Sequence, residues 1–259
     1  MDFAFVWKSF IAGILASIAC GLGALPLFIS PSKIHEKIGL GYSFAGGLMF
    51  AASVYNLLMP AFTIGGKEAH GFENSFKVLG GMALGCYFIH LVEKYLTEER
   101  LASKFLKPIG GKREILIFLA MCFHSVPEGI AVGVGYGSEA HLPQSDLGIY
   151  IAIAIAIHNV PEGLAVALPL KLKGEGFNKC FWLAFLTSLP QPLASVPASL
   201  LVWLFYPLML PLLGFAAGAM MYLVILELVP DALETRSRTE TASAFMLGFG
   251  TMALIQIGL

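Results

Sequence analysis

Eight apolar stretches, each long enough to cross a membrane as a helix, occupy most of this 259-residue chain. A membrane-spanning helix needs about 20 consecutive, mostly apolar residues. The composition agrees, because 57% of the residues are hydrophobic and only 13% are charged, whereas soluble domains carry about 25% charged residues. We therefore predict an all-α, polytopic integral membrane protein in which residues 1–259 form a single eight-span domain. The predicted spans are 9–30, 38–64, 75–96, 114–137, 147–170, 180–204, 207–230 and 240–259.

Basic residues predict how these spans are oriented in the membrane. If both termini are extracytoplasmic, 13 of the 16 lysine and arginine residues lie in or beside the cytosolic loops. The other side keeps only Lys8, Lys67 and Lys77. Cytosolic loops of membrane proteins carry an excess of basic residues, so this distribution favours extracytoplasmic termini. The plasma membrane and an organelle membrane follow the same rule, so the pattern does not separate them.

Charge and cysteine content argue against two other classes of function. A formal net charge of −1 provides no basic surface for nucleic acid. The four cysteines are far apart and form no Cys-x-x-Cys pair, so the sequence predicts neither a disulfide framework nor a thiolate metal site. We expect Cys20, Cys86, Cys122 and Cys180 to be buried, unreactive thiols.

One hexapeptide occurs twice within the apolar stretches, as HSVPEG at 124–129 and as HNVPEG at 158–163. Each copy places a histidine and a glutamate four residues apart, so both side chains lie on one face of a helix. Each copy also contains a proline, which removes a backbone donor and predicts an interruption of the helix. A charged side chain at the centre of a bilayer costs about 2.5–3.5 kcal/mol on insertion scales. Two such carboxylates in interrupted helices indicate an ion-binding site.

The four side chains of this doubled motif are His124, Glu128, His158 and Glu162. Two imidazoles and two carboxylates suit Zn²⁺, Fe²⁺ or Mn²⁺ better than Mg²⁺ or Ca²⁺. Consecutive spans are antiparallel, and each histidine is near the middle of its predicted span, so both pairs are expected near the membrane midplane. The alternative is a purely structural role, in which each His–Glu pair is a buried hydrogen bond. Two pairs at matched depth favour the metal site over this alternative.

Five further side chains within the spans are candidates near this site. Glu227, near the cytosolic end of its span, is either a metal ligand or an exit residue, with a solvated carboxylate as the alternative. The Gln191 amide either coordinates metal or satisfies the backbone of a helix bent by the prolines on both sides of it. Ser125 and Asn159 are more typical of hydrogen bonds between helices than of metal ligands. Met49 is, by itself, more typical of core packing.

Together these residues resemble the ZIP (Zrt/Irt-like) family of metal transporters, and within it the bacterial ZupT and GufA-like group. The resemblance rests on the paired motifs, the eight spans, the segment GGLMFAAS in the second span and the Gln-Pro pair in the sixth. It implies an inverted-repeat helical bundle that carries divalent metal, chiefly zinc and often iron or manganese, into the cytosol. It also implies that the two His–Glu pairs are metal ligands, that Met49 lies near the primary site and that Glu227 lies on the metal path.

Three positions depart from the pattern of the family. Ser125 and Asn159 occupy positions where relatives often carry Asn and, in some cases, Asp, and Gln191 stands where a glutamate is common. All three changes touch the second site of the two-metal centre of the family. We therefore expect one strong site, formed by the doubled motif, and a second site that is weak or absent.

The predicted function is transport of a divalent transition metal into the cytosol, with zinc first and iron and manganese as further candidates. The metal is cargo, so no cofactor is expected, and the predicted partners are metal ions and the lipid bilayer. The small-residue runs GLGALPL and GFAAGAMM are compatible with a homodimer as well as with packing inside one protomer. Because metal ligands must be deprotonated, metal binding is expected to weaken as the pH falls.

The main alternative is an intramembrane metalloenzyme in which the same ligands activate water. The sequence has no His-Glu-x-x-His motif and no separate general base beyond the ligands. Two symmetric motifs on antiparallel helices also suit the passage of an ion better than an asymmetric reaction. A static structural or sensing site is the third interpretation.

Overall fold

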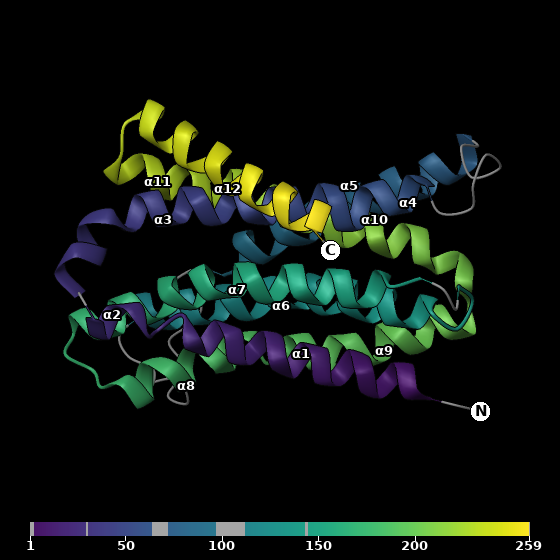
Figure 1. Cartoon of the computed structure of the whole chain (residues 1–259), viewed down its shortest axis with the longest axis horizontal. Coiled ribbons are helices and arrows are strands. Elements are labelled where there is room, and N and C mark those ends of the chain that lie inside the picture. Colours follow the sequence, from purple (N-terminus) through teal and green to yellow (C-terminus); the bar gives the residue numbers. More distant parts are fainter. Residues whose placement is uncertain (1–2, 30, 64–71, 97–111, 143–144, 259) are drawn as a thin grey trace.

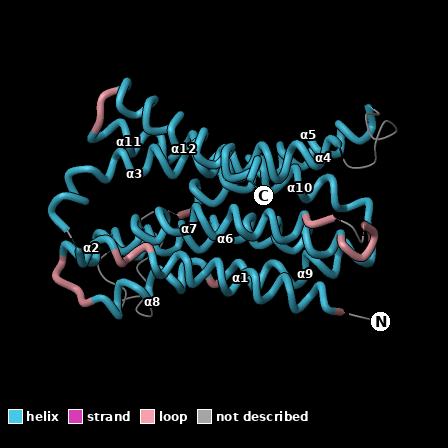
Figure 2. Tube along the Cα trace, viewed as in Figure 1, coloured by secondary structure: helices cyan, strands magenta, loops and turns pink. Residues whose placement is uncertain are grey.

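The computed structural model describes residues 3–29, 31–63, 72–96, 112–142 and 145–258. Every regular element in these ranges is a helix, and the described residues contain no strand (Figures 1 and 2). Eight helical segments are long and apolar enough to cross a membrane, which confirms the predicted all-α membrane protein with eight spans. These segments are Ala4–Phe28, Ile38–Thr63, Phe72–Tyr95, Ile117–Ser138, Leu147–Leu172, Phe177–Leu204, Tyr206–Thr235 and Arg238–Gly258.

The helices form two groups that lie against each other, one above the other in Figure 1. The first group contains α1 (Ala4–Leu22), α6 (Lys112–Ser138), α7 (Leu147–Leu172), α8 (Phe177–Ser188) and α9 (Pro190–Leu204). The second group contains α3 (Pro31–Ala52), α5 (Phe72–Tyr95), α10 (Met209–Leu223), α11 (Val229–Thr235) and α12 (Arg238–Gly258). The short elements that connect or extend these helices are α2 (Pro26–Ile29), α4 (Met59–Thr63) and η4 (Tyr206–Leu208). Both copies of the doubled motif therefore belong to the first group, on α6 and α7.

The prolines of the doubled motif do not break their helices. Pro127 lies within α6 and Pro161 lies within α7, and each helix is continuous across its proline. The predicted interruption is wrong at both points. A proline removes one backbone hydrogen bond, and membrane spans tolerate that loss where neighbouring helices and side chains satisfy the freed groups. The sixth span, in contrast, does change helix at its prolines, because α8 ends at Ser188 and α9 begins at Pro190.

Two other spans change their helical pitch in the interior. The π-helical turn η1 (Ser53–Leu58) follows α3, and the π-helical turn η5 (Val224–Leu228) follows α10. A proline is the second residue after each turn, Pro60 in one case and Pro230 in the other. Single π-helical turns inside α-helices are frequent at functional sites. The interruptions of regular helix that were predicted in the fourth and fifth spans are thus found in the second and seventh spans.

The glycines of the doubled motif allow close contact between helices. A Cβ atom on Gly163 would overlap the carbonyl oxygen of Cys20 on α1. A Cβ atom on Gly129 would overlap the carbonyl oxygen of Gln191 on α9. The backbones of α1 and α9 therefore approach α7 and α6 more closely than any larger residue would permit. This approach brings the polar side chains of α9 to the motif residues of α6.

The four cysteines are all free thiols. Cys20 and Cys180 are buried, as expected, whereas Cys86 and Cys122 are partly exposed. Cys86 Sγ lies 3.4 Å from the carbonyl oxygen of Gly218, so this thiol takes part in the contact between α5 and α10.

Candidate metal centre

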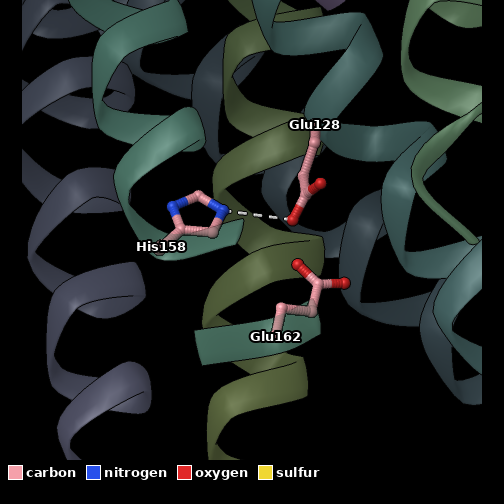
Figure 3. A group of neighbouring side chains, drawn as sticks. All are labelled: Glu128, His158 and Glu162. Atoms are coloured by element: carbon pink, nitrogen blue, oxygen red, sulfur yellow. Dashed lines mark hydrogen bonds and ion pairs between the residues drawn. The ribbon is translucent and has the colours of Figure 1, made fainter. Parts of the chain in front are cut away.

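Three of the four motif side chains meet in the interior of the protein (Figure 3). Glu128 comes from α6, and His158 and Glu162 come from one face of α7. One ligand atom from each residue lies within 4.8 Å of the other two, and His158 Nε2 is 3.1 Å from Glu128 Oε1. The exposed fractions of Glu128, His158 and Glu162 are 1%, 1% and 8%. We call these three residues the carboxylate–histidine cluster.

His124, the fourth residue of the predicted set, has a different partner. Its Nε2 atom lies 3.4 Å from Oε1 of Glu227 on η5. His124 is buried, and the Glu227 side chain is 33% exposed. Because η5 continues α10 of the second group, this contact joins the two groups of helices. The structure therefore places His124 with Glu227, one helical turn away from Glu128 along α6.

Gln191 and Asn159 hold Glu128 through a chain of hydrogen bonds. Gln191 Nε2 donates to Glu128 Oε2, and Asn159 Nδ2 donates to Gln191 Oε1 over 3.2 Å. The same Asn159 amide lies 3.1 Å from the carbonyl oxygen of Ala16 and 3.3 Å from Ser188 Oγ. Both amides are fully buried, so their hydrogen bonds orient the carboxylate and connect α1, α6, α7, α8 and α9. Here the two residues act as supports of the cluster.

The last two predicted candidates take part in packing between helices. Ser125 Oγ lies 3.0 Å from the carbonyl oxygen of Met121 and 3.1 Å from that of Thr187 on α8. Met49 on α3 is 4% exposed and belongs to the same apolar core cluster as Ile155 on α7. The hydroxyl of Ser125 is thus used between α6 and α8, and the thioether of Met49 lies in the packing between the two groups.

Several polar atoms at the site are buried and have no hydrogen-bond partner among the described residues. They are Nδ1 of His124, Nδ1 of His158, Oδ1 of Asn159 and Oε2 of Glu162. Buried polar atoms almost always have a partner, and the interior of a membrane supplies no bulk water. Imidazole nitrogens and carboxylate oxygens are ligands of divalent zinc. Oε2 of Glu162 is therefore suited to bind a cation together with Nε2 of His158, the ring nitrogen that faces Glu128, whereas Nδ1 of His158 lies on the far side of the ring (Figure 3).

One polar residue that sequence analysis did not select is Asn56, the fourth residue of η1. It is 4% exposed, and its Nδ2 atom lacks a hydrogen-bond partner within the described part of the chain. The sequence does contain a pattern that could have identified it. Asn56 lies four residues before a proline inside a span, and Glu227 lies three residues before one.

Comparison with known proteins places this arrangement in a family. A sequence profile described as ZIP Zinc transporter matches residues 109–256, which is more than half of the chain. Zinc transporter GufA of Myxococcus xanthus is 31% identical over 95% of this chain and 96% of its own length. The chain belongs to the ZIP family. The resemblance seen in the sequence is thereby confirmed.

Two further relatives extend the comparison of this ZIP chain. Zinc transporter ZupT of Stenotrophomonas maltophilia (strain R551-3) is 28% identical over 96% of the chain and 94% of its own length. A putative zinc transporter of Arabidopsis thaliana is 35% identical over 90% of the chain but over only 36% of its own, much greater length. ZIP proteins are transporters rather than enzymes, so the metalloenzyme interpretation is not favoured. Family and spans together identify a multi-pass integral membrane protein.

Proposed function

We propose that this protein carries zinc into the cytosol through the carboxylate–histidine cluster, with His124 as a fourth ligand. The observation that carries the proposal is the burial of one imidazole and two carboxylates together on two adjacent membrane spans. Three relatives with zinc transport in their names support zinc as the cargo. The unpartnered carboxylate oxygen of Glu162 supports exchange of an ion's water molecules for protein atoms.

Charge balance supports a divalent cargo. The carboxylates of Glu128 and Glu162 together offset the charge of one divalent cation, which reduces the electrostatic cost of holding it inside the membrane. Zinc takes nitrogen and oxygen ligands in a four-coordinate site, and iron(II) and manganese(II) accept the same atom types. We therefore include iron and manganese as further substrates. His124 and Glu227, which meet where the two groups touch, offer the next nitrogen and oxygen atoms toward the cytosol.

The distribution of basic residues supports extracytoplasmic termini and inward transport. On this proposal residues 1–259 form one transport domain, whose partners are divalent ions and the bilayer, and the metal is substrate rather than cofactor.

Both small-residue runs, GLGALPL and GFAAGAMM, pack against other helices of the same protomer. A Cβ on Gly218 of GFAAGAMM would overlap the carbonyl oxygen of Met82, and one on Gly23 of GLGALPL would overlap that of Val160. The homodimer stays a prediction.

Uptake into proteoliposomes tests the proposed function. Vesicles that contain the purified protein, and matched protein-free vesicles, receive zinc, iron(II) or manganese(II) outside, and the metal inside is measured over time. We expect protein-dependent uptake that is fastest for zinc. Folded protein that binds zinc tightly but moves none of the three metals would contradict transport and favour a static site.

Replacing Gln191 by glutamate is expected to create a second zinc site. The amide now donates to Glu128 Oε2, and a carboxylate in its place would repel Glu128 unless a cation lies between them. We expect the wild-type protein to bind one zinc per chain and Gln191→Glu to bind two, counted by metal analysis after equilibrium dialysis in detergent. Gln191→Ala is the control, because it removes the donor without adding a carboxylate. One zinc per chain in Gln191→Glu would contradict the expectation.

A further inference from the structure

The two π-helical turns occupy corresponding places in two antiparallel spans. η1 ends with a hydrogen bond from Met59 N–H to Val54 O, and η5 ends with one from Val229 N–H to Val224 O. Both turns fall in the second half of their spans, Ile38–Thr63 and Tyr206–Thr235. The second and seventh spans run in opposite directions, so one turn lies toward each face of the membrane.

Each turn carries a polar side chain shortly before its proline, since Asn56 of η1 lies four residues before Pro60 and Glu227 of η5 lies three residues before Pro230. Glu227 contacts His124 over 3.4 Å. Asn56 is more than nine-tenths buried, and among the described residues its Nδ2 atom has no hydrogen-bond partner. A buried amide with an unused polar atom in a membrane span calls for a partner that the described residues do not supply.

Helix packing locates Asn56 relative to the cluster. Ala51 of α3 and Ala154 of α7 belong to one buried apolar cluster, and the two helices are antiparallel. Asn56 is five residues beyond Ala51, and His158 is four residues beyond Ala154 in the opposite direction. Asn56 and His158 therefore lie on opposite sides of this apolar cluster along the helix axes. Asn56 is displaced toward the face at which α7 begins, away from the face toward which Glu227 lies.

Met49, Ser53 and Asn56 lie on one face of the second span, at positions i, i+4 and i+7. All three residues are buried. Ser53 Oγ donates to the carbonyl oxygen of Met49 over 2.8 Å, so its hydroxyl is already used within the helix. Asn56 is the member of this stripe with an unpartnered polar atom.

We propose that Asn56 binds the hydrated divalent cation on its approach to the carboxylate–histidine cluster, as the counterpart of Glu227 on the other side. This inference rests on the proposed transport function. A carboxamide carries an acceptor oxygen and a donor nitrogen, and rotation about its last bond exchanges their places. After such a rotation, Oδ1 takes the place of the unpartnered Nδ2 and can bind the cation or accept a hydrogen bond from a water molecule bound to it. Being neutral, the amide holds the ion less strongly than the two carboxylates that follow.

Zinc uptake by Asn56→Leu proteoliposomes tests this role. Loss of a binding step that precedes the cluster should raise the KM for zinc about tenfold and leave kcat unchanged. Zinc affinity of the detergent-solubilised protein, which reports the cluster, should stay at the wild-type value. A wild-type KM in Asn56→Leu would overturn the proposal. A parallel loss of zinc affinity and thermal stability would overturn it as well, because both would mark Asn56 as a packing residue.

A second variant keeps the test decisive if the leucine variant fails to fold. Asn56→Cys places a soft ligand on the path, and cadmium prefers such ligands more than zinc does. The ratio of cadmium to zinc uptake should rise severalfold in Asn56→Cys. Ser199→Cys is the matched control, since Ser199 is buried in α9, where its hydroxyl donates to the carbonyl oxygen of Val196, and its ratio should equal that of the wild type. A ratio of cadmium to zinc uptake in Asn56→Cys that equals the ratio in the control variant would overturn the proposal.

These outcomes also separate this inference from the proposed function. If the wild-type protein moves no metal, transport itself fails. If the wild-type protein transports zinc while Asn56→Leu keeps the wild-type KM and Asn56→Cys keeps the wild-type ratio, transport stands and the role of Asn56 fails.

Discussion

Zinc uptake by the double variant His158→Ala/Glu162→Ala is expected to fall to the level of protein-free vesicles. The variant removes one imidazole and one carboxylate from a cluster whose ligand atoms lie within 4.8 Å of one another. Loss of a residue that only supports a metal ligand typically costs 10–100-fold in affinity or activity, so loss of two ligands should cost about 100-fold or more. Uptake into proteoliposomes measures the flux, and calorimetry in detergent measures zinc binding, which should be lost with it.

The matched control for this experiment is His90→Ala/Glu93→Ala. It removes the same two chemical groups from another membrane span, α5, where both residues are exposed at the surface of the protein. Its uptake should equal that of the wild type. Retention of zinc flux by His158→Ala/Glu162→Ala would contradict the assignment of the cluster as the transport site, and equal loss in the control would show that the assay reports folding instead.

Replacing Gly163 by alanine is expected to destabilise the protein strongly. The added methyl group would overlap the backbone carbonyl of Cys20, which cannot rotate away as a side chain can, so α1 and α7 must move apart. Overpacking of this kind costs about 3 kcal/mol or more when neighbours cannot adjust, which corresponds to a Tm lowered by roughly 6–12 °C in a chain of this size. Thermal unfolding in detergent, followed by the loss of monodisperse protein, measures the change.

Gly80→Ala is the control for this prediction. Gly80 lies in α5 and has open space where its Cβ would be. Alanine is the better helix former, so Gly80→Ala should leave the Tm unchanged or raise it slightly. A Tm of Gly163→Ala that equals that of Gly80→Ala would contradict the close backbone contact between α1 and α7.

The number and type of the spans could be predicted because hydrophobic length is a local property of the sequence. The pairing of Glu128 with the His158 and Glu162 of the next span could be anticipated from the spacing within the motif and the antiparallel order of the spans. Whether a proline interrupts its helix could not be predicted, since the helix around Pro127 or Pro161 persists through contacts supplied by other helices. The irregular turns arise instead before Pro60 and Pro230, and nothing in the local sequence distinguishes these prolines from Pro127 and Pro161.

The partner of His124 also depended on information absent from the local sequence. Spacing places His124 and Glu128 on one face of α6, one helical turn apart. Which neighbour each side chain meets is decided by the position of η5 in the second group and of α9 in the first. Asn159 and Gln191 could be recognised as hydrogen-bonding residues, but their connection through one another to Glu128 required the crossing of α7 and α9.

The contact between His124 and Glu227 leaves one ring nitrogen of the histidine for a cation. Nε2 of His124 lies 3.4 Å from Oε1 of Glu227, so Nδ1 is the ring nitrogen that this contact does not occupy. Nδ1 of His124 is the ring atom that is buried without a partner in the described structure. A carboxylate beside one ring nitrogen of a histidine fixes the orientation of the ring. A cation that binds His124 through Nδ1 would therefore leave Nε2 beside Glu227, so that this contact between the two groups of helices persists while the site is occupied.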